Sequence, residues 1–275
     1  MIVVTGATGN VGRPLVRALA EAGEQVTAVS RGITATDVPE GVLHRQADVA
    51  DPAGLEPALD GADALFLLTS GDLVLGGGSI DGALEAARSS GVRRVVLLSS
   101  QGVGSLRHPP VFEDAVKRSG LEWTVLRPGG FGSNAYQWAD AVRERREVAA
   151  PFGDVALPVI DPLDIAEVAA AALLDGGHGG ATYVLTGPAP VTPRQQAAAI
   201  GDALGEPVRF VEQSRAEARA QMVRFMPAQV VDATLAILGT PFPEEQRVSP
   251  DVEHVLGRAP RTFAEWAARN GAAFK

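Results

Sequence analysis

Several residue types that carry chemistry in other proteins are missing from this sequence or scarce in it. The 275 residues include no cysteine, which excludes disulfides, thiolate metal sites and a cysteine nucleophile. The four histidines stand at no spacing typical of a metal site, so no zinc or iron centre is expected. Catalysis, if the chain performs it, is expected to rest on a bound organic cofactor or on oxygen and nitrogen side chains.

The charge balance excludes two classes of partner. The formal net charge is −9, whereas a surface for nucleic acid or anionic membrane needs clustered Lys and Arg. No apolar run approaches the roughly 20 residues of a membrane span. Ile2–Thr5 is apolar but short, and it leads into a glycine loop rather than a cleavage site. We therefore expect a cytoplasmic protein without nucleic-acid or membrane partners, and the sequence leaves a homodimer open.

The first half of the chain alternates short apolar runs with amphipathic runs. The apolar runs predict strands at Ile2–Thr5, Gln25–Ser30, Val42–Gln46, Ala64–Thr69, Arg94–Ser99 and Glu122–Leu126. The amphipathic runs predict helices at Val11–Glu21, Ala53–Leu59, Ser79–Ser90 and Val111–Ser119. Several strand runs are continuously apolar, which is typical of parallel strands covered on both faces. This alternation predicts an α/β fold with a doubly wound parallel Rossmann sheet.

The rhythm changes after Arg127. Helices are expected at Asn134–Glu147, Leu163–Leu174, Pro193–Leu204, Arg215–Phe225, Gln229–Leu238 and Phe263–Asn270, with a loop over 151–158. A strand at 181–186 is expected to return to the sheet. We divide the chain into an NAD(P)-binding Rossmann domain at 1–150, completed by that strand, and a smaller, interleaved C-terminal α/β lobe at 151–275 that binds substrate. Met222, Phe225 and Met226 of this lobe are interpreted as core packing.

A glycine-punctuated run, TGATGNVG from Thr5, joins the first strand to the first helix. Gly6 permits a tight turn, Gly9 lets the backbone approach a pyrophosphate, and Gly12 lets the helix pack closely. Backbone N–H groups and the positive end of the helix dipole then face the phosphate oxygens. The run predicts a nicotinamide-dinucleotide site. Its expected cofactor contacts are Gly6, Thr8, Gly9, Asn10 and Val11.

The end of the second strand bears on which nicotinamide cofactor is bound. An acidic residue there binds the ribose hydroxyls of NAD and repels the 2′-phosphate of NADP. Here Ser30 can donate a hydrogen bond and Arg31 can pair with that phosphate. The pair favours NADP(H), with NAD(H) left open. The alternative for Arg31 is an ordinary solvated arginine.

Two further strand ends reach the same edge of the predicted sheet. Asp48 and Val49 follow the third strand, where a carboxylate can accept from the adenine amino group. The alternative for Asp48 is a place in the N-cap region before Asp51. Thr69 and Ser70 end the fourth strand at the mouth of the crevice where ligands bind in such sheets.

Runs along the chain resemble the NmrA-like group of atypical short-chain dehydrogenase/reductases. They are TGATGNVG from Thr5, VLLSS from Val96, SGLEWTVLRPGGF from Ser119, DPLDIAEVAAAAL from Asp161, TYVLTGP from Thr182 and GRAPRTF from Gly257. The resemblance implies an NADP(H)-preferring Rossmann domain and a small C-terminal lobe, with substrate entering between them. It also implies that Pro128, Gly129 and Phe131 line the nicotinamide end. Members of the group are quinone and azo reductases, tailoring enzymes of aromatic natural products in secondary metabolism, and redox-sensing regulators.

The usual proton donor of short-chain dehydrogenases is missing. Those enzymes reduce ketones with a Tyr-x-x-x-Lys pair, in which the lysine lowers the pKa of the tyrosine. The only tyrosines are Tyr136 and Tyr183, and neither precedes a lysine by four residues. Glu113 stands four residues before Lys117, and we interpret these two as a solvated i,i+4 pair. Simple ketone reduction by a tyrosine acid is therefore not expected.

The absent pair suggests hydride transfer to an acceptor whose product anion is already stable. Quinones and conjugated polycyclic ketones meet this condition, because delocalisation replaces the proton donor. The leading hypothesis is an NADP(H)-dependent oxidoreductase acting on a small quinone-like or aromatic polyketide-like substrate. One alternative is a non-catalytic protein that senses the redox state of NADP(H). Another is a tailoring enzyme of the oxygenase type in aromatic natural-product biosynthesis.

A few polar residues are candidates to assist the reaction. Ser99 and Ser100 follow the fifth strand, and the alternative for them is ordinary strand-end hydrogen bonding. His108 precedes two prolines and is a candidate acid or base, or else a surface histidine. Asn134 and Tyr136 are candidates to contact a substrate carbonyl beside Phe131, the alternative for Asn134 being a helix cap.

Overall fold

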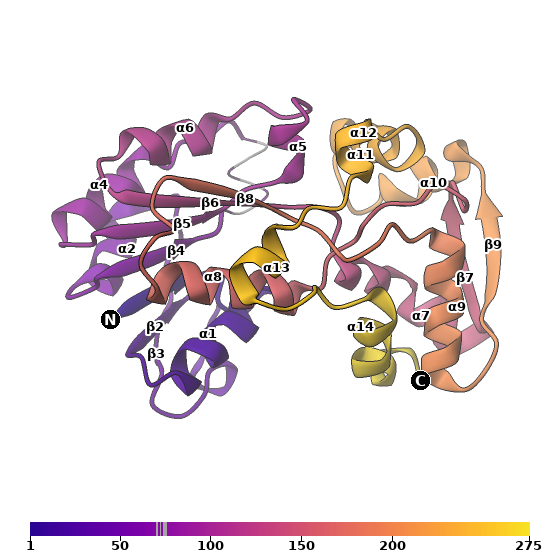
Figure 1. Cartoon of the computed structure of the whole chain (residues 1–275), viewed down its shortest axis with the longest axis horizontal. Helices are drawn as coiled ribbons and strands as arrows, with labels where there is room; N and C mark the ends of the chain where they lie inside the picture. Colours follow the sequence, from indigo (N-terminus) through magenta and orange to yellow (C-terminus); the bar gives the residue numbers. More distant parts are fainter. Residues whose placement is uncertain (70, 72, 74–75) are drawn as a thin grey trace. The chain divides into compact units, whose positions relative to one another are not determined.

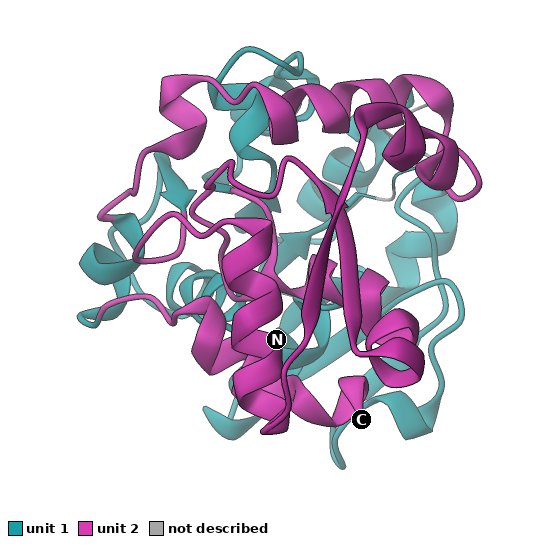
Figure 2. Cartoon of the chain, turned by 90° about the vertical axis from the view of Figure 1, so that its right-hand side faces the viewer, with its two compact units in different colours: residues 1–128, 162–185, 251–258 teal, residues 129–161, 186–250, 259–275 magenta. Residues whose placement is uncertain are grey.

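A computed structural model of the chain describes residues 1–69, 71, 73 and 76–275. The chain divides into two compact units, coloured separately in Figure 2. The first comprises Met1–Pro128, Pro162–Leu185 and Asp251–Arg258, and the second comprises Gly129–Asp161, Thr186–Pro250 and Ala259–Lys275. The first unit thus ends its N-terminal segment at Pro128, earlier than the predicted boundary at residue 150. It also takes in the expected returning strand, together with residues 162–180 and 251–258, which the sequence assigned to the C-terminal lobe.

The first unit is built on a parallel sheet of seven strands, which confirms the predicted α/β Rossmann fold (Figure 1). Its strands, in chain order, are β1 (Ile2–Thr5), β2 (Val26–Val29), β3 (Leu43–Arg45), β4 (Ala64–Leu67), β5 (Arg94–Leu98), β6 (Glu122–Pro128) and β8 (Ala181–Leu185). In space they run β3-β2-β1-β4-β5-β6-β8. The chain order reverses between β1 and β4, and ligands of doubly wound sheets bind outside the carboxyl ends of the strands at such a point.

Helices cover both faces of this sheet because its strands are apolar on both sides. Buried side chains of α2 (Pro52–Leu59), α4 (Asp81–Ser89) and α6 (Val111–Arg118) share one core with Val3, Leu65 and Val95 of the strands. Successive strand residues point to opposite faces, so Val4, Phe66 and Val96, which are fully buried, belong to the other face. There α1 (Gly12–Glu21) packs against α8 (Pro162–Leu174), and α13 (Asp251–Leu256) packs against α8 and β8 (Figure 1).

The second unit contains a small sheet that the sequence analysis missed. Strand β7 (Glu147–Pro151) pairs in parallel with β9 (Arg209–Gln213). The expected helix over 134–147 is therefore wrong in its extent: a 3-10 helix, η2 (Gly132–Trp138), is followed by α7 (Ala139–Arg145), and the chain then becomes a strand. The remaining elements are α9 (Pro193–Leu204), α10 (Arg215–Met222), α11 (Ala228–Gly239), α12 (Pro243–Gln246), α14 (Phe263–Asn270) and a 3-10 helix, η3 (Gly271–Phe274).

The second unit has a larger hydrophobic cluster that contains buried aromatic side chains and a separate, smaller cluster. Phe263, Trp266 and Phe274 are buried together with Val142 and Val148. A separate small cluster under α10 and α11 includes the partly buried Met222 and Met226, as expected. The expectation that Phe225 packs in a core is wrong, since 82% of this residue is exposed. It follows α10 directly, in the short connection to α11.

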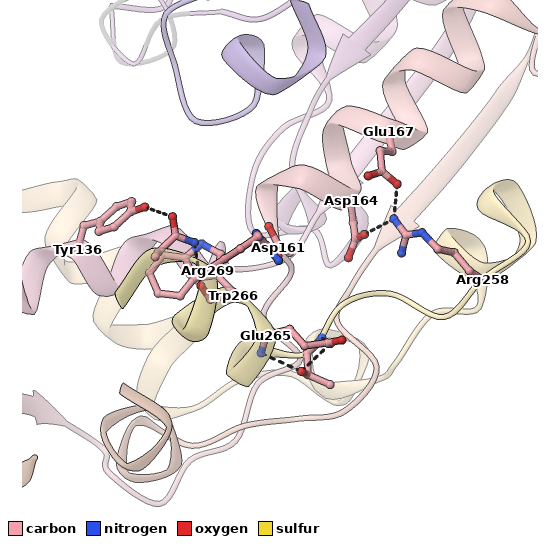
Figure 3. Close-up of polar contacts among 10 residues, drawn as sticks. Tyr136, Asp161, Asp164, Glu167, Arg258, Glu265, Trp266 and Arg269 are labelled. Atoms are coloured by element: carbon pink, nitrogen blue, oxygen red, sulfur yellow. Dashed lines mark hydrogen bonds and ion pairs between the residues drawn. The ribbon is translucent and has the colours of Figure 1, made fainter. Parts of the chain in front are cut away.

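A buried ion pair fastens the returning C-terminal segment to the first unit (Figure 3). Asp164, in the first turn of α8, is fully buried and accepts a hydrogen bond of 2.7 Å from Nη2 of Arg258. The same guanidinium also pairs with Glu167, one helical turn further along α8. Without Arg258 the buried Asp164 carboxylate would lose a charge partner, which is costly.

We expect Arg258→Ala to lower the free energy of unfolding by about 2–3 kcal/mol, below the range for fully buried pairs because about a third of the Arg258 side chain is exposed. The matched control is Arg88→Ala, which breaks an exposed pair with Glu85 and should cost less than about 0.5 kcal/mol. Urea unfolding of both variants measures the difference. Equal losses would contradict this account of the buried pair.

Candidate cofactor and active site

The glycine loop has the geometry that a dinucleotide site requires. Gly6 has a φ of +64°, and the N–H of Gly9 donates to the Gly6 carbonyl oxygen at 3.0 Å, which closes the turn. A Cβ placed on Gly12 would lie 2.2 Å from that same oxygen. Since this atom is backbone, only glycine allows α1 to begin so close to the loop.

The start of α1 is suited to a pyrophosphate. The N-cap residue Val11 makes no side-chain cap, and no acidic side chain stands in the first turn. The helix terminus therefore keeps its positive potential for a ligand anion. The Thr8 hydroxyl lies 3.0 Å from the Ser30 hydroxyl, so the loop is tied to the end of β2. These features fit a dinucleotide on the residues that the sequence singled out, Gly6, Thr8, Gly9, Asn10 and Val11.

The other predicted cofactor residues lie at the carboxyl ends of neighbouring strands. Arg31 is exposed just beyond β2. Oδ1 of Asp48 accepts a hydrogen bond of 3.0 Å from the N–H of Ala50, in the turn just before α2. This agrees with the alternative of a structural role near the helix start. The other carboxylate oxygen, Oδ2, can still accept from a ligand. The side chain of Val49 is buried in the core, so this residue offers a ligand only its backbone. Thr69 is partly buried beyond β4, and Ser70 lies outside the described residues.

A buried charge network stands at the carboxyl ends of β5 and β6. Arg127 donates to Glu113 through both Nε (2.9 Å) and Nη2 (2.6 Å), and the Ser99 hydroxyl donates to the same carboxylate at 2.7 Å. Lys117 does pair with Glu113, at 3.6 Å, but only 1% of the Glu113 side chain is exposed. The interpretation of a solvated pair is therefore wrong. Sequence spacing showed the lysine one turn away and not the arginine on a neighbouring strand.

The pKa of Glu113 follows from this network. Burial by itself raises the pKa of the carboxyl group. The hydrogen bonds from Arg127 and Ser99, with the charges of Arg127 and Lys117, outweigh burial and hold the pKa below its ordinary value. Glu113 is thus a carboxylate at neutral pH and accepts hydrogen bonds only. The Ser99 proton is committed to it.

The Ser100 hydroxyl accepts a hydrogen bond, whereas the Ser99 hydroxyl donates one. The Ser100 oxygen accepts the N–H of Gly102 at 3.1 Å, at the start of the short helix α5 (Gln101–Gly104), which leaves the hydroxyl proton available to donate. His108 lies beside it. A Cβ on Gly102 would come within 3.0 Å of His108 Nε2 and 3.4 Å of Ser100 Oγ, so both side chains gather around this glycine. Gly102 was not singled out in the sequence, and its isolated place outside any motif gave no signal.

The predicted substrate residues belong to the second unit. The Tyr136 hydroxyl donates to Oδ1 of Asn270 at 2.6 Å, and its ring meets Trp266 edge-on (Figure 3). Burial and the nearby Asp161 charge raise the pKa of Tyr136, so it is a neutral donor at physiological pH. Asn134 lies exposed inside η2, whose N-cap is Phe131, so its alternative role as a helix cap is wrong. Phe131 pairs by backbone with Ile160.

Neither a metal cluster nor a membrane-spanning helix occurs in the part of the chain that the structure describes. There, no three His, Asp or Glu side chains gather closely enough to hold a metal ion. No helix in those residues is long and apolar enough to cross a membrane.

Comparison with known proteins places the chain among NAD(P)H-dependent enzymes. A family model described as NAD(P)H-binding matches residues 6–176. A (4-alkanoyl-5-oxo-2,5-dihydrofuran-3-yl)methyl phosphate reductase of Streptomyces griseus is 37% identical over 100% of this chain and 99% of its own length. An NAD(P)H azoreductase of Xenophilus azovorans is 35% identical with the same coverage. The crystal structure of an Escherichia coli NADPH-dependent quinone oxidoreductase complexed with NADPH superimposes with a TM-score of 0.81 at 26% identity, over 98% of this chain and 99% of that one.

The fold and the glycine loop thus define a nicotinamide-dinucleotide-binding Rossmann protein, and the chain belongs to the NAD(P)H-binding family. More particularly, it is an NmrA-like atypical short-chain dehydrogenase/reductase, as its sequence runs indicated. It is an NAD(P)H-dependent oxidoreductase. The predicted family, enzyme class and cofactor are confirmed.

We expect Gly12→Ala to abolish measurable NADPH binding, because the added methyl group cannot fit against the Gly6 carbonyl without moving the loop. Overpacking of this kind should also cost about 1–3 kcal/mol of stability. Cofactor titration by fluorescence and thermal unfolding measure the two effects. The control is Gly176→Ala, where nothing lies within 4 Å of an added Cβ and both properties should persist. Normal NADPH affinity in Gly12→Ala would contradict the assigned loop geometry.

We expect Glu113→Gln to lower the free energy of unfolding by about 2–4 kcal/mol near neutral pH, because it leaves Arg127 without its counter-charge. A group whose folded pKa is lowered stabilises the fold above its unfolded pKa of about 4.3 and loses that effect as pH falls through the folded value. The difference between parent and variant should therefore be constant above about pH 5 and shrink below about pH 4. Urea unfolding from pH 3 to 7 measures it. A difference that grows on acidification would refute the sign, and Glu85→Gln, in an exposed pair, is the control.

Proposed function

We propose that this oxidoreductase prefers NADP(H) and passes hydride to a quinone-like or aromatic polyketide-like acceptor whose product anion is delocalised. The observation that carries the proposal is the ionised Glu113, fixed by Arg127, in a chain that has no Tyr-x-x-x-Lys pair. Ser99 donates to this carboxylate and cannot also protonate a substrate. Neither Glu113 nor Ser99 can therefore supply a proton to an acceptor that needs one.

The cofactor-holding residues would act by position and charge. The bound nicotinamide supplies the hydride. The loop from Gly6 to Gly12 would hold the pyrophosphate with backbone N–H groups, and Ser30 with Arg31 would hold the adenosine 2′-phosphate. Asp48 and the backbone of Val49 would face the adenine, and Thr69 would lie at the mouth of the crevice; Ser70, also a candidate, lies outside the described residues. Pro128, Gly129 and Phe131 would line the nicotinamide end.

Ser100 is the better of the two serines for contact with the reacting acceptor. Its proton is free to donate, whereas that of Ser99 is not. A donor aimed at an oxygen that gains negative charge stabilises the transition state more than the ground state. His108, which shares the space around Gly102, remains a candidate acid or base. Asn134 and Tyr136 remain candidate contacts to a substrate carbonyl, which for Tyr136 requires its hydroxyl to leave Oδ1 of Asn270.

The names of the relatives describe acceptors with one chemical property in common. In the furanone named for the Streptomyces griseus reductase, the ring double bond is conjugated with both the ring carbonyl and the alkanoyl carbonyl. The other two relatives are named for azo and quinone reduction. Hydride addition to such a furanone or to a quinone gives an anion spread over two or more atoms. This shared property supports a conjugated acceptor for the present chain. The cytoplasmic location expected from the sequence stays a prediction.

The test is an acceptor panel followed by NADPH oxidation. A naphthoquinone, a 4-acyl-furanone, an azo dye and cyclohexanone are offered at equal concentration. We expect at least one conjugated acceptor to exceed cyclohexanone by about 10²-fold or more in kcat/KM, the factor that a missing general acid typically withholds. Comparable turnover of cyclohexanone would refute the proposal. Tight NADPH binding without turnover of any acceptor would do so as well and would favour a redox-sensing protein.

A further inference from the structure

An arginine stands where the first helix leaves the glycine loop. Arg13 directly follows Gly12, and its backbone N–H donates to the Gly9 carbonyl at 3.1 Å, so the loop geometry fixes its Cα. About half of the side chain is exposed, and its Nη2 lies 3.7 Å from Oδ1 of Asp37. The side chain is thus directed toward the loop that follows β2.

Helix stability does not account for a cation at this position. The N-terminus of a helix carries partial positive charge, so a guanidinium in the first turn is electrostatically unfavourable. No acidic side chain in that turn offsets it. Arg13 therefore adds to the positive potential of a terminus that already attracts anions.

The loop after β2 brings a phosphate-binding position within reach of Arg13. Strands β1 and β2 pair with Thr5 opposite Val29, so the glycine loop and the loop after β2 leave the same edge of the sheet. The hydroxyls of Thr8 and Ser30 join the two loops at 3.0 Å. In Rossmann folds the adenosine 2′ position lies at the end of the second strand, where Ser30 and Arg31 stand here.

Asp37 is held in place by its own loop. Its Oδ2 accepts hydrogen bonds from the Thr34 backbone N–H (2.9 Å) and the Thr34 hydroxyl (2.8 Å), at the start of a short 3-10 helix, η1 (Ala35–Asp37). Arg13 meets Asp37 only through the longer 3.7 Å contact with the other oxygen. A phosphate monoester, with about two negative charges, is a stronger partner for a guanidinium than a single carboxylate.

We propose that Arg13 is a second ligand of the adenosine 2′-phosphate, which it binds together with Arg31 by exchanging Asp37 for the phosphate. The inference rests on the proposed preference for NADP(H). Asp37 then competes with the phosphate for Arg13 and, as an anion in the same loop, repels it. Arg13 raises selectivity for NADP(H) over NAD(H), and Asp37 limits it.

The test measures binding without any acceptor, so it is independent of turnover. Dissociation constants are determined by calorimetry for NADPH, NADH, adenosine 2′,5′-bisphosphate and adenosine 5′-monophosphate. We expect Arg13→Ala to weaken NADPH and the bisphosphate about tenfold or more, the loss of one charge-assisted hydrogen bond, and to change NADH and the monophosphate less than about twofold. Arg13→Lys should keep part of the selectivity, and Asp37→Asn should tighten NADPH while leaving NADH unchanged.

The matched control is Arg17→Ala, one helical turn further along the exposed side of α1. It removes the same charge and should leave all four constants unchanged. Equal weakening of NADPH and NADH by Arg13→Ala, or no effect on either, would overturn the proposal, as would weaker NADPH binding in Asp37→Asn. A parent protein that binds NADPH and NADH equally would instead refute the proposed cofactor preference. Loss of selectivity in Arg31→Ala alone would leave that preference standing and exclude Arg13.

Discussion

The contact between Gly12 and the carbonyl oxygen of Gly6 determines where the first helix begins. A methyl group at Gly12 would sit 2.2 Å from this backbone oxygen, so the turn and the helix can approach each other only through glycine. The approach aims the uncapped end of α1 at the space beyond β1. It also fixes the Cα of Arg13 and, through the Thr8–Ser30 hydrogen bond, the relation of the loop to β2. One steric requirement thus places both parts of the phosphate site.

A second constraint acts at the carboxyl ends of β5 and β6. Burial of Glu113 is tolerated because Arg127 engages both of its oxygens and Ser99 adds a third hydrogen bond. A satisfied buried network of this kind rigidifies the elements that it joins. Here it joins α6 to both strand ends, directly before Ser100 and Pro128. The same network leaves neither Glu113 nor Ser99 able to donate a proton to a substrate, because the carboxylate is ionised and the serine proton is donated to it.

The sequence revealed what local pattern encodes. The glycine loop, the first six strands and the sequence runs typical of the family could be predicted, because turn chemistry and apolar periodicity depend on a few neighbouring residues. Contacts between segments far apart in the sequence could not be predicted in this way. The sequence does not predict strand β7, and it assigns the first residue of this strand, Glu147, to a helix, because the partner β9 lies some sixty residues later. Glu113 read as half of an i,i+4 pair, because its stronger partner lies on a strand. The exposed Phe225 shows that an apolar residue type does not by itself establish burial.

The loss of a general acid restricts acceptors by an amount that can be estimated. Hydride addition to an isolated ketone forms an alkoxide, whose conjugate acid has a pKa close to that of water and far above that of a phenol. Addition to a quinone forms a phenolate, whose conjugate acid has a pKa of about 10. Each pKa unit between the two conjugate acids is worth about 1.4 kcal/mol, so the phenolate is the more stable product anion by several kcal/mol. A positioned acid contributes about 3–6 kcal/mol, equivalent to 10²–10⁴-fold. Delocalisation in a conjugated acceptor therefore offsets part of what a tyrosine acid supplies to an isolated ketone, which supports the proposed acceptor class.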